Sequence, residues 1–412
     1  MPPTITMIAP VVSFCIPTFN RCRYLDSLLG SLTQLLADFP HSYEVFISDN
    51  GSPDETPEVV ARYAEQLPLR YVRHESNQGG GPNWQYLMKH AQGRYVVYVA
   101  DDDCILGPEV ARIITLLEAN PEVGVAYAPW KLFDLVTDKD MGQFYRQDED
   151  VVVPQGRYLQ LLDAVLRFKA FPEIYIGRRD LILKIMPRVQ EQSFYAFVHA
   201  AEFAQHAAVL FLKDPYYVSV TNYFADHQRE QAGSQEAEVA WDRYRSGLEY
   251  ILGRAAGQIT EEQRLEFMRR IEVMIAERVA VAVRLRVANQ RDPVETYYLA
   301  YRLKAMGAER LLSVPLPTLA AYAAMEFLLC DGELNRGVSE LVCLGAFPAD
   351  VRTYIDRHAK VPVRHVDTLE QWAGGEESTL VFTRAGIQPE QLPAHCRARQ
   401  ISEENLLCKF VS

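Results

Sequence analysis

Three consecutive carboxylates, Asp101, Asp102 and Asp103, follow the apolar run Tyr95–Ala100. Neighbouring carboxylates repel one another, and a divalent cation, which prefers hard oxygen ligands, relieves that repulsion. If the apolar run is a strand, the three side chains lie at the carboxyl edge of a sheet, where a bound cation could bridge two phosphate groups. An isolated acidic triplet is more often a solvated turn or a helix start, but its place after an apolar run favours a cation site.

Two further polar segments follow apolar runs earlier in the chain. Arg21 comes after the run 11–16 and could reach a phosphate; the alternative is a helix capped by Asn20 that carries Arg21 on its surface. Asp49, in the run Ser-Asp-Asn-Gly-Ser-Pro-Asp-Glu-Thr at 48–56, could accept a hydrogen bond from a base N–H or a ribose hydroxyl. The alternative there is an ordinary turn between a strand and a helix, because Asp, Asn, Gly and Ser form turns for local reasons.

The elements that must position these residues alternate along the first 130 residues. Apolar runs predict strands at 11–16, 43–48, 69–74, 95–100 and 124–128, and helical periodicity predicts helices at 21–39, 54–67, 82–91 and 108–119. This alternation is typical of an α/β fold with a mostly parallel sheet covered on both faces. Ligands of such sheets bind beyond the carboxyl ends of the strands, and the polar segments occupy those places.

The rest of the chain divides less clearly. Residues 131–160 look irregular and charged, and 226–238 reads as a polar loop or domain edge. From 240 to 329 the pattern is almost entirely helical, and from 341 onward strands and short helices alternate again. We therefore expect three parts: an α/β domain at 1–230, a helical domain at 231–340 and a small α/β module at 341–412.

The motifs, taken in order, resemble the family 2 glycosyltransferases with the GT-A fold. They are Ile-Pro-Thr-Phe-Asn-Arg, then Ser-Asp-Asn-Gly-Ser-x-Asp-Glu-Thr, then Asn-x-Gly-Gly-Gly-x-Asn before Gly-x-Tyr-x-x-Tyr-x-x-Asp-Asp-Asp. The resemblance covers roughly residues 11–224. It implies transfer of a sugar, with inversion, from a nucleoside diphosphate sugar to a hydroxyl of a saccharide or lipid-linked acceptor. The setting that the family implies is synthesis of bacterial surface polysaccharide or another glycoconjugate.

The resemblance also implies a role for each matching residue. The nucleotide-sugar site would be formed by Pro17, Thr18, Asn20, Arg21, Asp49, Asn77, Asn83, Asp101 and Asp102. Asp103 would be the direct ligand of the cofactor, a divalent metal such as Mn²⁺ or Mg²⁺, with Asp101 near the ribose and metal. The family usually has Arg or a small residue before the second Asn of its third motif, where this chain has Pro82.

The catalytic base is expected on the helix near residue 202. Glu202 is the first choice and His199 is the rival, because imidazole also suits the task. The Glu-Asp pair of the family is absent, since Ala201 precedes Glu202, and the alternative for Glu202 is an exposed helix carboxylate. Trp130, after a strand end, could stack on an acceptor sugar.

A loop after the next strand carries His227 and Arg229. His227 could complete the metal shell and Arg229 could clamp a phosphate in bidentate fashion. The alternative is a polar loop without such contacts.

Two other classes compete with this interpretation. A nucleotidyltransferase acting on sugar phosphates would show a glycine-rich loop with Lys or Arg near the first strand, and 16–21 has no glycine. A sugar-nucleotide-binding protein with weak catalysis is compatible with the missing Glu-Asp pair.

Composition limits the kinds of ligand and the cellular compartment that we expect for this protein. The net charge is −12 over 412 residues, which argues against bulk binding of nucleic acid. Seven dispersed cysteines without a Cys-x-x-Cys pair argue against a zinc ribbon and fit a reducing compartment. The sequence shows no signal peptide and no membrane span, so we expect a cytoplasmic protein, with peripheral attachment to the inner face of the membrane and homo-oligomerisation through the helical segment as options.

Overall fold

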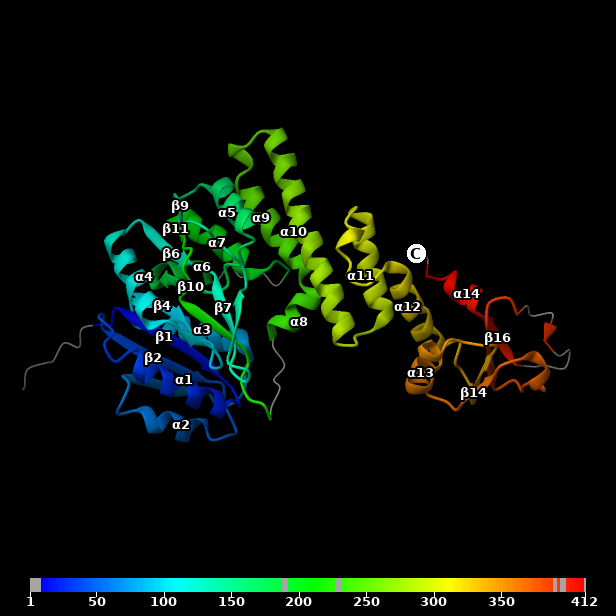
Figure 1. Cartoon of the computed structure of the whole chain (residues 1–412). Coiled ribbons are helices and arrows are strands. Elements are labelled where there is room, and N and C mark those ends of the chain that lie inside the picture. The colour runs from blue at the N-terminus through cyan, green and yellow to red at the C-terminus, as the bar shows by residue number, and fades with distance from the viewer. Residues whose placement is uncertain (1–8, 187–191, 227–231, 388–390, 393–397, 411–412) are drawn as a thin grey trace, which may run out of the picture. The chain divides into compact units, whose positions relative to one another are not determined.

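The computed structural model describes residues 9–186, 192–226, 232–387, 391–392 and 398–410 (Figure 1). The chain forms two compact units. Unit 1 comprises Met1–Gln231 and Asp242–Met274, and unit 2 comprises Ala232–Trp241 and Ile275–Ser412. The expected domain end at 230 lies next to the first of these boundaries, but the segment Asp242–Met274 also belongs to unit 1.

The main sheet of unit 1 has eight strands. In spatial order they are β3 (Leu69–Arg73), β2 (Tyr43–Asp49), β1 (Val12–Thr18), β4 (Tyr95–Tyr98), β10 (Tyr175–Arg178), β6 (Val123–Tyr127), β11 (Ala208–Phe211) and β9 (Val151–Val153). The first four are parallel to one another, as are β6 and β11, whereas β10 and β9 run antiparallel to their neighbours. The predicted α/β class is confirmed, and the sheet is mixed because β10 and β9 run opposite to the rest.

The central strands are buried along almost their whole length. β1 and β2 each have an unbroken run of buried residues, from Val12 to Ile16 and from Glu44 to Asp49. Because successive side chains of a strand point to opposite faces, both faces of the sheet must be covered. Helix α1 shows how: its buried side chains Leu25, Leu28, Leu29 and Leu32 recur at helical spacing on one face.

The helices of unit 1 lie between and after these strands. They are α1 (Cys22–Leu35), α2 (Thr56–Tyr63), α3 (Gly80–His90), α4 (Gly107–Ala119), α5 (Tyr158–Phe168), α6 (Arg179–Ile185), α7 (Tyr195–His206), α9 (Trp241–Arg254), the 3₁₀ turn Ala256–Gln258 and the first half of α10 (Glu261–Ala288).

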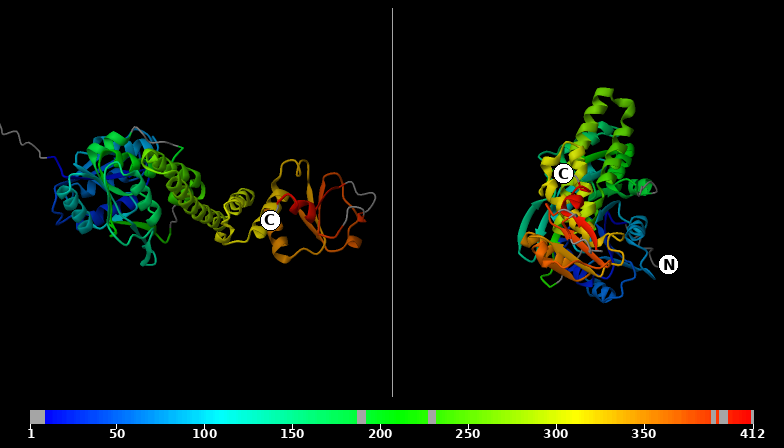
Figure 2. Two further views of the ribbon diagram at one scale, coloured as in Figure 1. Left: turned by 90° about the horizontal axis from the view of Figure 1, so that it is seen from above. Right: turned by 90° about the vertical axis from the view of Figure 1, so that its right-hand side faces the viewer.

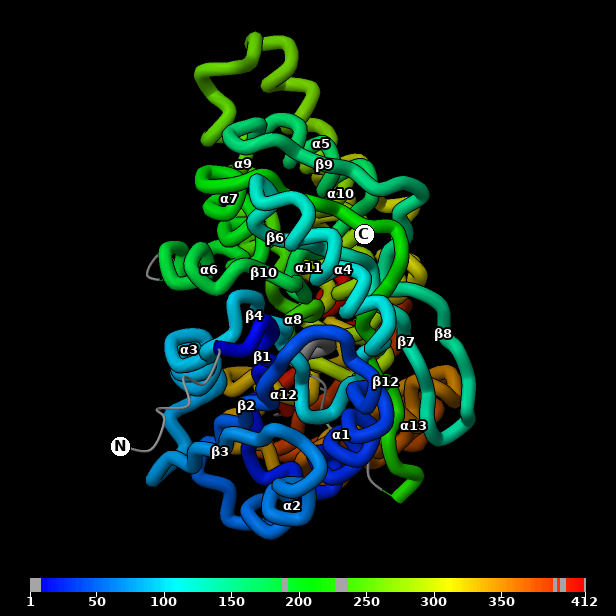
Figure 3. Tube along the Cα trace, turned by 90° about the vertical axis from the view of Figure 1, so that its left-hand side faces the viewer, coloured from blue at the N-terminus to red at the C-terminus, as the bar shows by residue number. Residues whose placement is uncertain are grey.

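A second sheet of unit 1 was not foreseen from the sequence. Its order is β5 (Cys104–Ile105), β12 (Tyr217–Asn222), β7 (Trp130–Asp134) and β8 (Lys139–Gln143). β7 and β8 form an antiparallel hairpin (Figure 3). The expectation of an irregular segment at 131–160 is therefore wrong: this stretch contains β7, β8 and β9, whose polar and partly exposed residues lack the apolar runs that marked the other strands.

Unit 2 contains helices and a small sheet, which is coloured orange to red in Figure 2. Its helices are α8 (Ala232–Val239), the end of α10, α11 (Pro293–Ala305), α12 (Leu316–Cys330), α13 (Ala349–His358), α14 (Glu403–Leu407) and the 3₁₀ turns Glu309–Leu311 and Leu369–Gln371. Its strands, all parallel, are in the order β14 (Val363–Val366), β13 (Glu340–Leu344), β15 (Thr379–Thr383) and β16 (Arg399–Ser402). The C-terminal α/β module is thus present, and α8 begins within the segment expected to be a loop.

In the part of the chain that the structure describes, no helix combines the length and the apolar character that crossing a membrane requires.

Candidate active site

The polar segments meet at the carboxyl ends of β2, β1 and β4, which are neighbours in the sheet. The register places Thr18 opposite Asp49 where β1 and β2 end. β4 pairs with the other side of β1, and the acidic triplet follows it within a few residues. Three segments far apart in sequence thus converge at one sheet edge.

Arg21 and Thr18 hold the first two carboxylates of the triplet. The Nη1 atom of Arg21 lies 3.0 Å from Oδ1 of Asp101 and 2.8 Å from Oδ2 of Asp102. The Thr18 hydroxyl donates a hydrogen bond of 2.8 Å to the other oxygen of Asp101. Both carboxylates are buried, so the guanidinium compensates charge that would otherwise be expensive. The alternative of a helix capped by Asn20 is wrong, because the residue before α1 is Arg21, whose side chain makes no capping hydrogen bond, and Arg21 is bound to two carboxylates.

Asp103 faces the second sheet instead. Its Oδ2 accepts a hydrogen bond of 2.8 Å from the Tyr217 hydroxyl, and its Oδ1 accepts one of 2.9 Å from the backbone N–H of Val220. Burial raises the pKa of Asp103 to about 6, although these two hydrogen bonds act in the opposite direction. Both carboxylate oxygens therefore fasten the triplet to β12.

Asp49 is fully buried and bonded within its own turn. Its Oδ1 accepts a hydrogen bond from Ser52 N–H at 2.8 Å, which is the local turn that the alternative interpretation predicted. Its Oδ2 accepts one of 2.6 Å from the Tyr71 hydroxyl and lies 3.6 Å from Nε of Arg73 on β3. Burial, together with the Asp49 hydrogen bond, raises the pKa of Tyr71, which keeps this hydroxyl a donor.

Side-chain hydrogen bonds join Asn83 to β2 and Asn77 to the residue that follows β2. The Nδ2 atom of Asn50 donates to Oδ1 of Asn77 at 2.8 Å. Asn83, in the first turn of α3, accepts from the Ser48 hydroxyl at 2.6 Å and donates to the Ser48 carbonyl at 3.0 Å. Asn50 and Ser48 were missed by the sequence analysis, although the Asn-Gly pair in this turn was a signal for the first of them.

The first loop has its own backbone constraint. Asn20 adopts a φ of 55°, in the left-handed region that asparagine tolerates better than most residues. Its N–H donates a hydrogen bond of 2.8 Å to the Ser52 hydroxyl. Pro17 lies within β1 opposite Ser48. The loop that carries Arg21 is thereby fixed to the turn after β2.

His199 lies on α7 and is 1% exposed. Its ring stacks on Trp84 of α3, with centroids 6.1 Å apart and an interplanar angle of 20°. Within the described part of the chain, neither ring nitrogen has a hydrogen-bond partner. Burial lowers the pKa of His199 to about 4, while the charge of Glu202 opposes that shift. The imidazole is therefore neutral at neutral pH.

Glu202, one turn further along α7, is also 1% exposed, so the alternative of an exposed carboxylate is wrong. The Tyr250 hydroxyl donates a hydrogen bond to its Oε1, and Nη1 of Arg254 lies 3.7 Å from the same oxygen. Arg254 also donates to the Tyr158 hydroxyl at 2.7 Å. These contacts tie α9 to α7 and α5.

Trp130 is 6% exposed and is covered by other rings. Phe144 stacks on it at 4.5 Å with an interplanar angle of 11°, and Tyr145 packs edge-on at 5.6 Å. Phe144 is the ring of this stack that is exposed, at 40%. His227 and Arg229 lie outside the described residues.

The side chains at the sheet edge include oxygen atoms that could bind a divalent cation. Among the described residues, no group of three or more His, Cys, Asp or Glu side chains is arranged to hold a metal ion. Asp101 and Asp102 nevertheless supply hard carboxylate oxygens at the sheet edge. Mg²⁺ in phosphate-handling sites is commonly held by one or two carboxylates, with water and substrate phosphates completing its shell. The residues present fit that arrangement.

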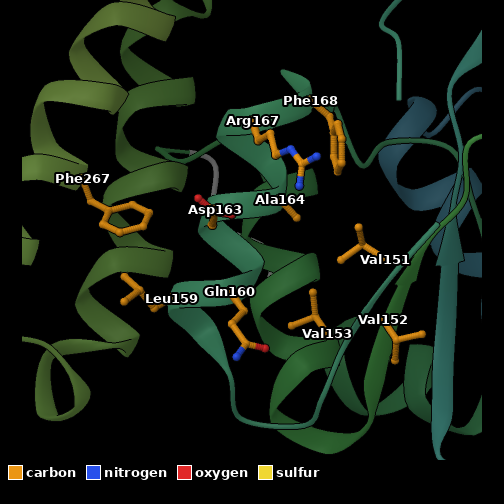
Figure 4. A pocket seen from close by; sticks show the side chains of 10 residues that line it. All are labelled: Val151, Val152, Val153, Leu159, Gln160, Asp163, Ala164, Arg167, Phe168 and Phe267. Carbon is orange, nitrogen blue, oxygen red and sulfur yellow. The ribbon is translucent and has the colours of Figure 1, made fainter. Parts of the chain in front are cut away.

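Two cavities of unit 1 lie apart from these residues. One, of about 360 Å³, is lined by β9, by one face of α5 and by Phe267 (Figure 4). The other, of about 520 Å³, is polar and includes Gln143, the last residue of β8, and Arg146 and Gln147 after it. Neither contains a predicted site residue.

The sheet, its polar carboxyl edge and the motifs that form it resemble those of a known class. Residues 13–180 match the family model described as glycosyl transferase family 2. The matched residues include Arg21, Asp49 and the acidic triplet, so this part of the chain is similar to family 2 glycosyltransferases. Helix α7, which carries His199 and Glu202, lies beyond the matched residues.

Particular relatives share this segment. An abequosyltransferase, RfbV, of Salmonella typhimurium is 33% identical over 115 residues, which are 27% of this chain and 34% of that protein. A validoxylamine A glucosyltransferase of Streptomyces hygroscopicus subsp. jinggangensis is 43% identical over 129 residues, 29% of this chain and 28% of that protein. The matched segment thus spans about a third of the length of such curated relatives.

A solved structure shares more of the chain at lower identity. It is TarS 1-349 of S. aureus in complex with UDP-GlcNAc, with 18% identity and a TM-score of 0.47 over 73% of this chain and 89% of that one. The strand order of this chain defines its fold.

Proposed function

We propose that unit 1 transfers a sugar from a nucleoside diphosphate sugar to an acceptor hydroxyl, with inversion and with the help of Mn²⁺ or Mg²⁺. The observation that carries the proposal is the convergence of Arg21, Thr18, Asp101 and Asp102 at the carboxyl edge of a domain similar to family 2 glycosyltransferases. A cationic side chain beside paired carboxylates suits a diphosphate with its cation. Synthesis of bacterial surface polysaccharide or another glycoconjugate is the proposed setting.

Within the triplet we assign the cation to Asp102, with Asp101 beside it, rather than to Asp103. Both oxygens of Asp103 accept hydrogen bonds from β12, and a cation there would have to break them. Asp102 instead pairs with Arg21, whose side chain is partly exposed. When bound, the cation would stabilise the negative charge of the departing diphosphate.

We assign the base to His199 rather than to Glu202. A general base must be unprotonated at the working pH and able to receive a proton. The lowered pKa of His199 leaves its ring neutral, and no hydrogen bond within the described residues competes for its nitrogens. Because the ring is 1% exposed and stacked on Trp84, the proposal requires Trp84 to turn aside when an acceptor binds. Oε1 of Glu202 already accepts from Tyr250 and lies near Arg254, so Glu202 is a positioning residue in this proposal.

In this proposal the sugar is transferred in a single displacement at its anomeric carbon. The acceptor hydroxyl gives its proton to a ring nitrogen of His199 while its oxygen bonds to the anomeric carbon. The bond from that carbon to the diphosphate breaks, and its electron pair leaves with the diphosphate. In-line attack of this kind inverts the anomeric centre. Phe144, the exposed ring of the stack with Trp130, is the proposed platform for a saccharide or lipid-linked acceptor.

The first test identifies a donor. A panel of nucleotide sugars is screened with Mn²⁺ by thermal shift, because a ligand of the folded state raises its stability. Donor hydrolysis is then measured for wild type and for Asp102→Asn. Loss of Mn²⁺-dependent hydrolysis in Asp102→Asn supports the proposal, whereas binding without turnover of any donor points to a sugar-nucleotide-binding protein.

The second test separates the two candidate bases on the identified donor and acceptor. We expect His199→Asn to lower kcat by about 10²–10⁴ with unchanged donor affinity, as for loss of a general base. Glu202→Gln keeps the shape of the Tyr250 contact and is expected to lower kcat by less than about tenfold. The reverse order of the two effects would return the base to Glu202.

A further inference from the structure

Arg21 occupies the position in which a cation would neutralise the carboxylates. One guanidinium nitrogen lies within 3.0 Å of both Asp101 and Asp102, whose side chains are each 4% exposed, while the Arg21 side chain is 36% exposed. Two buried carboxylates so close together need a positive partner. Arg21 is one such partner, and its side chain has access to solvent.

We propose that Arg21 is an internal counter-ion that stands in for the metal and leaves the carboxylates when a nucleoside diphosphate arrives. This inference rests on the proposed function. A divalent cation that binds alone competes with Arg21 for the same carboxylates and therefore binds weakly. A diphosphate offers Arg21 a new partner, since the guanidinium fork matches phosphate oxygens.

Thr18 holds Asp101, but not Asp102, in place when Arg21 moves to the diphosphate. Its hydroxyl bonds Asp101 at 2.8 Å on the oxygen that Arg21 does not contact, so Asp101 stays anchored when Arg21 moves. Asp102 loses its ion pair with Arg21, so the charge that Arg21 balanced becomes available to a cation. Arg21 directly precedes α1, which begins at Cys22, and Cys22 N–H is held by Asp54 at 2.9 Å. The backbone can therefore remain in place while the long side chain swings.

The consequence is cooperativity between cation and nucleotide. Each removes an obstacle to the other: the diphosphate takes Arg21 away, and the cation replaces the charge that Arg21 supplied. Such coupling is reciprocal, so the nucleotide tightens cation binding by the same factor as the cation tightens nucleotide binding. An apo site closed by its own arginine would also avoid holding metal without substrate.

The experiment measures Mn²⁺ binding directly, by electron paramagnetic resonance of the free ion, with Mn²⁺ alone and with UDP or GDP. The proteins are wild type, Arg21→Gln, Arg21→Lys and Asp102→Asn. Arg23→Gln is the matched control, because Arg23 lies two residues from Arg21 and carries the same charge. Its side chain is exposed and pairs with Asp226. We expect Arg21→Gln to bind Mn²⁺ alone roughly fivefold more tightly than wild type, the size expected from losing a partly exposed ion pair.

The same variant should show a smaller gain in Mn²⁺ affinity from the nucleotide, and Arg21→Lys should behave closer to wild type because it retains the charge. Unchanged or weaker Mn²⁺ binding by Arg21→Gln, or tightening no greater than in Arg23→Gln, overturns the inference. Those outcomes leave the proposed function intact so long as Asp102→Asn loses Mn²⁺. If Asp102→Asn binds Mn²⁺ as wild type does, the metal assignment of the proposed function fails instead.

Discussion

The three carboxylates of the triplet have the same chemistry and different partners. Asp101 is held by Thr18 and Arg21, Asp102 is held by Arg21, and Asp103 belongs to the hydrogen bonds of β12. The direction of each side chain, and not its type, therefore decides what it can do. The same holds on α7, where the ring nitrogens of His199 have no hydrogen-bond partner among the described residues and Glu202 accepts a hydrogen bond from Tyr250.

The different partners of Asp102 and Asp103 predict different losses of unfolding free energy when each is replaced by alanine. Asp103→Ala leaves the Tyr217 hydroxyl and the Val220 N–H buried without their acceptor, and each such loss costs about 1–3 kcal/mol. We expect the variant to lose about 3 kcal/mol of unfolding free energy in urea without metal. Asp102→Ala removes the ion pair with Arg21, whose side chain reaches solvent, and should therefore cost less stability than Asp103→Ala. Equal losses would show that Asp103 has no special structural role.

His199 should make stability depend on pH. Its pKa in the folded protein is about 4, below its ordinary 6.5, so between these values the unfolded chain binds a proton that the folded one does not. Stability is unaffected above pH 6.5 and falls as the pH drops towards 4, by about 2 kcal/mol at pH 5. His199→Phe keeps a ring against Trp84 and removes this loss.

The measurement compares urea unfolding at pH 8 and pH 5 for both proteins. His206→Phe, in the last turn of the same helix, is the control and should behave as wild type. The prediction fails if His199→Phe loses as much stability as wild type between the two pH values.

At the residue level the sequence predicted which side chains reach the sheet edge but not how they pair. Strand ends are local features, so the convergence of Thr18, Arg21 and Asp101 followed from three apolar runs. The partner of Asp103 lies 114 residues away on β12, and no local pattern identifies it. The burial of Glu202 depends on Tyr250, 48 residues further on, in a helix whose position could not be read from its own periodicity.

Among the elements, those with the plainest physical signal were predicted best. β1, β2 and β4 are buried on both faces and appear in the sequence as apolar runs, and α1 shows a clean apolar stripe. β7 and β8 form a partly exposed hairpin whose second strand, Lys-Asp-Met-Gly-Gln, has no apolar alternation. The first strand of the hairpin, β7, also pairs with β12, which follows much later in the chain.

At the opposite end of the sheet from the candidate site, Gly93 packs closely against the start of β1. Gly93 donates its N–H to the Ser13 hydroxyl at 2.7 Å, next to the buried carboxylate of Glu44, which accepts from Gln92 N–H at 2.7 Å and from Arg70. A Cβ on Gly93 would lie 2.4 Å from Ser13 N and 2.6 Å from Val12 C. Both atoms belong to the backbone of β1 and cannot move aside as a side chain could.

We therefore expect Gly93→Ala to lower the free energy of unfolding by about 2–3 kcal/mol, the usual range for overpacking. Gly253→Ala is the matched control, because Gly253 lies in α9 with open space around it and should gain about 0.5–1 kcal/mol from the better helix former. Chemical denaturation of both variants checks the pair. A neutral Gly93→Ala would mean that β1 can shift at this point.

At the scale of the whole chain, unit 1 does not end where its sheet ends. Helix α9 follows a segment assigned to unit 2 and then returns to pack on α7: Phe194 N–H bonds the Arg243 carbonyl at 2.9 Å, and Gly247 lies so close to Phe197 that an added Cβ would be 2.9 Å away. The sequence placed a boundary at 230 because the polar segment there resembles a linker. It could not separate α9 from the later helices, since all of them share one helical periodicity.

This arrangement predicts how fragments of the chain behave. A fragment of residues 1–230 lacks Tyr250 and Arg254, and so leaves the buried carboxylate of Glu202 without these two partners. It also lacks Tyr244, whose ring packs edge-on against Phe171 at 5.2 Å and Phe194 at 4.7 Å. Removing partners of a buried charge and part of an aromatic core costs several kcal/mol, comparable to the about 5–15 kcal/mol that hold a domain folded.

We expect 1–230 to aggregate or to lack a cooperative thermal transition, whereas 1–274, which contains all of unit 1, unfolds cooperatively and keeps its near-ultraviolet circular dichroism. A fragment of residues 1–288, which completes α10, controls for the cut inside that helix. If 1–230 and 1–274 unfold at the same temperature with the same cooperativity, α9 is dispensable for the fold of unit 1. In that case the contacts of Glu202 would not be structural, and its assignment as a positioning residue would lose its main support.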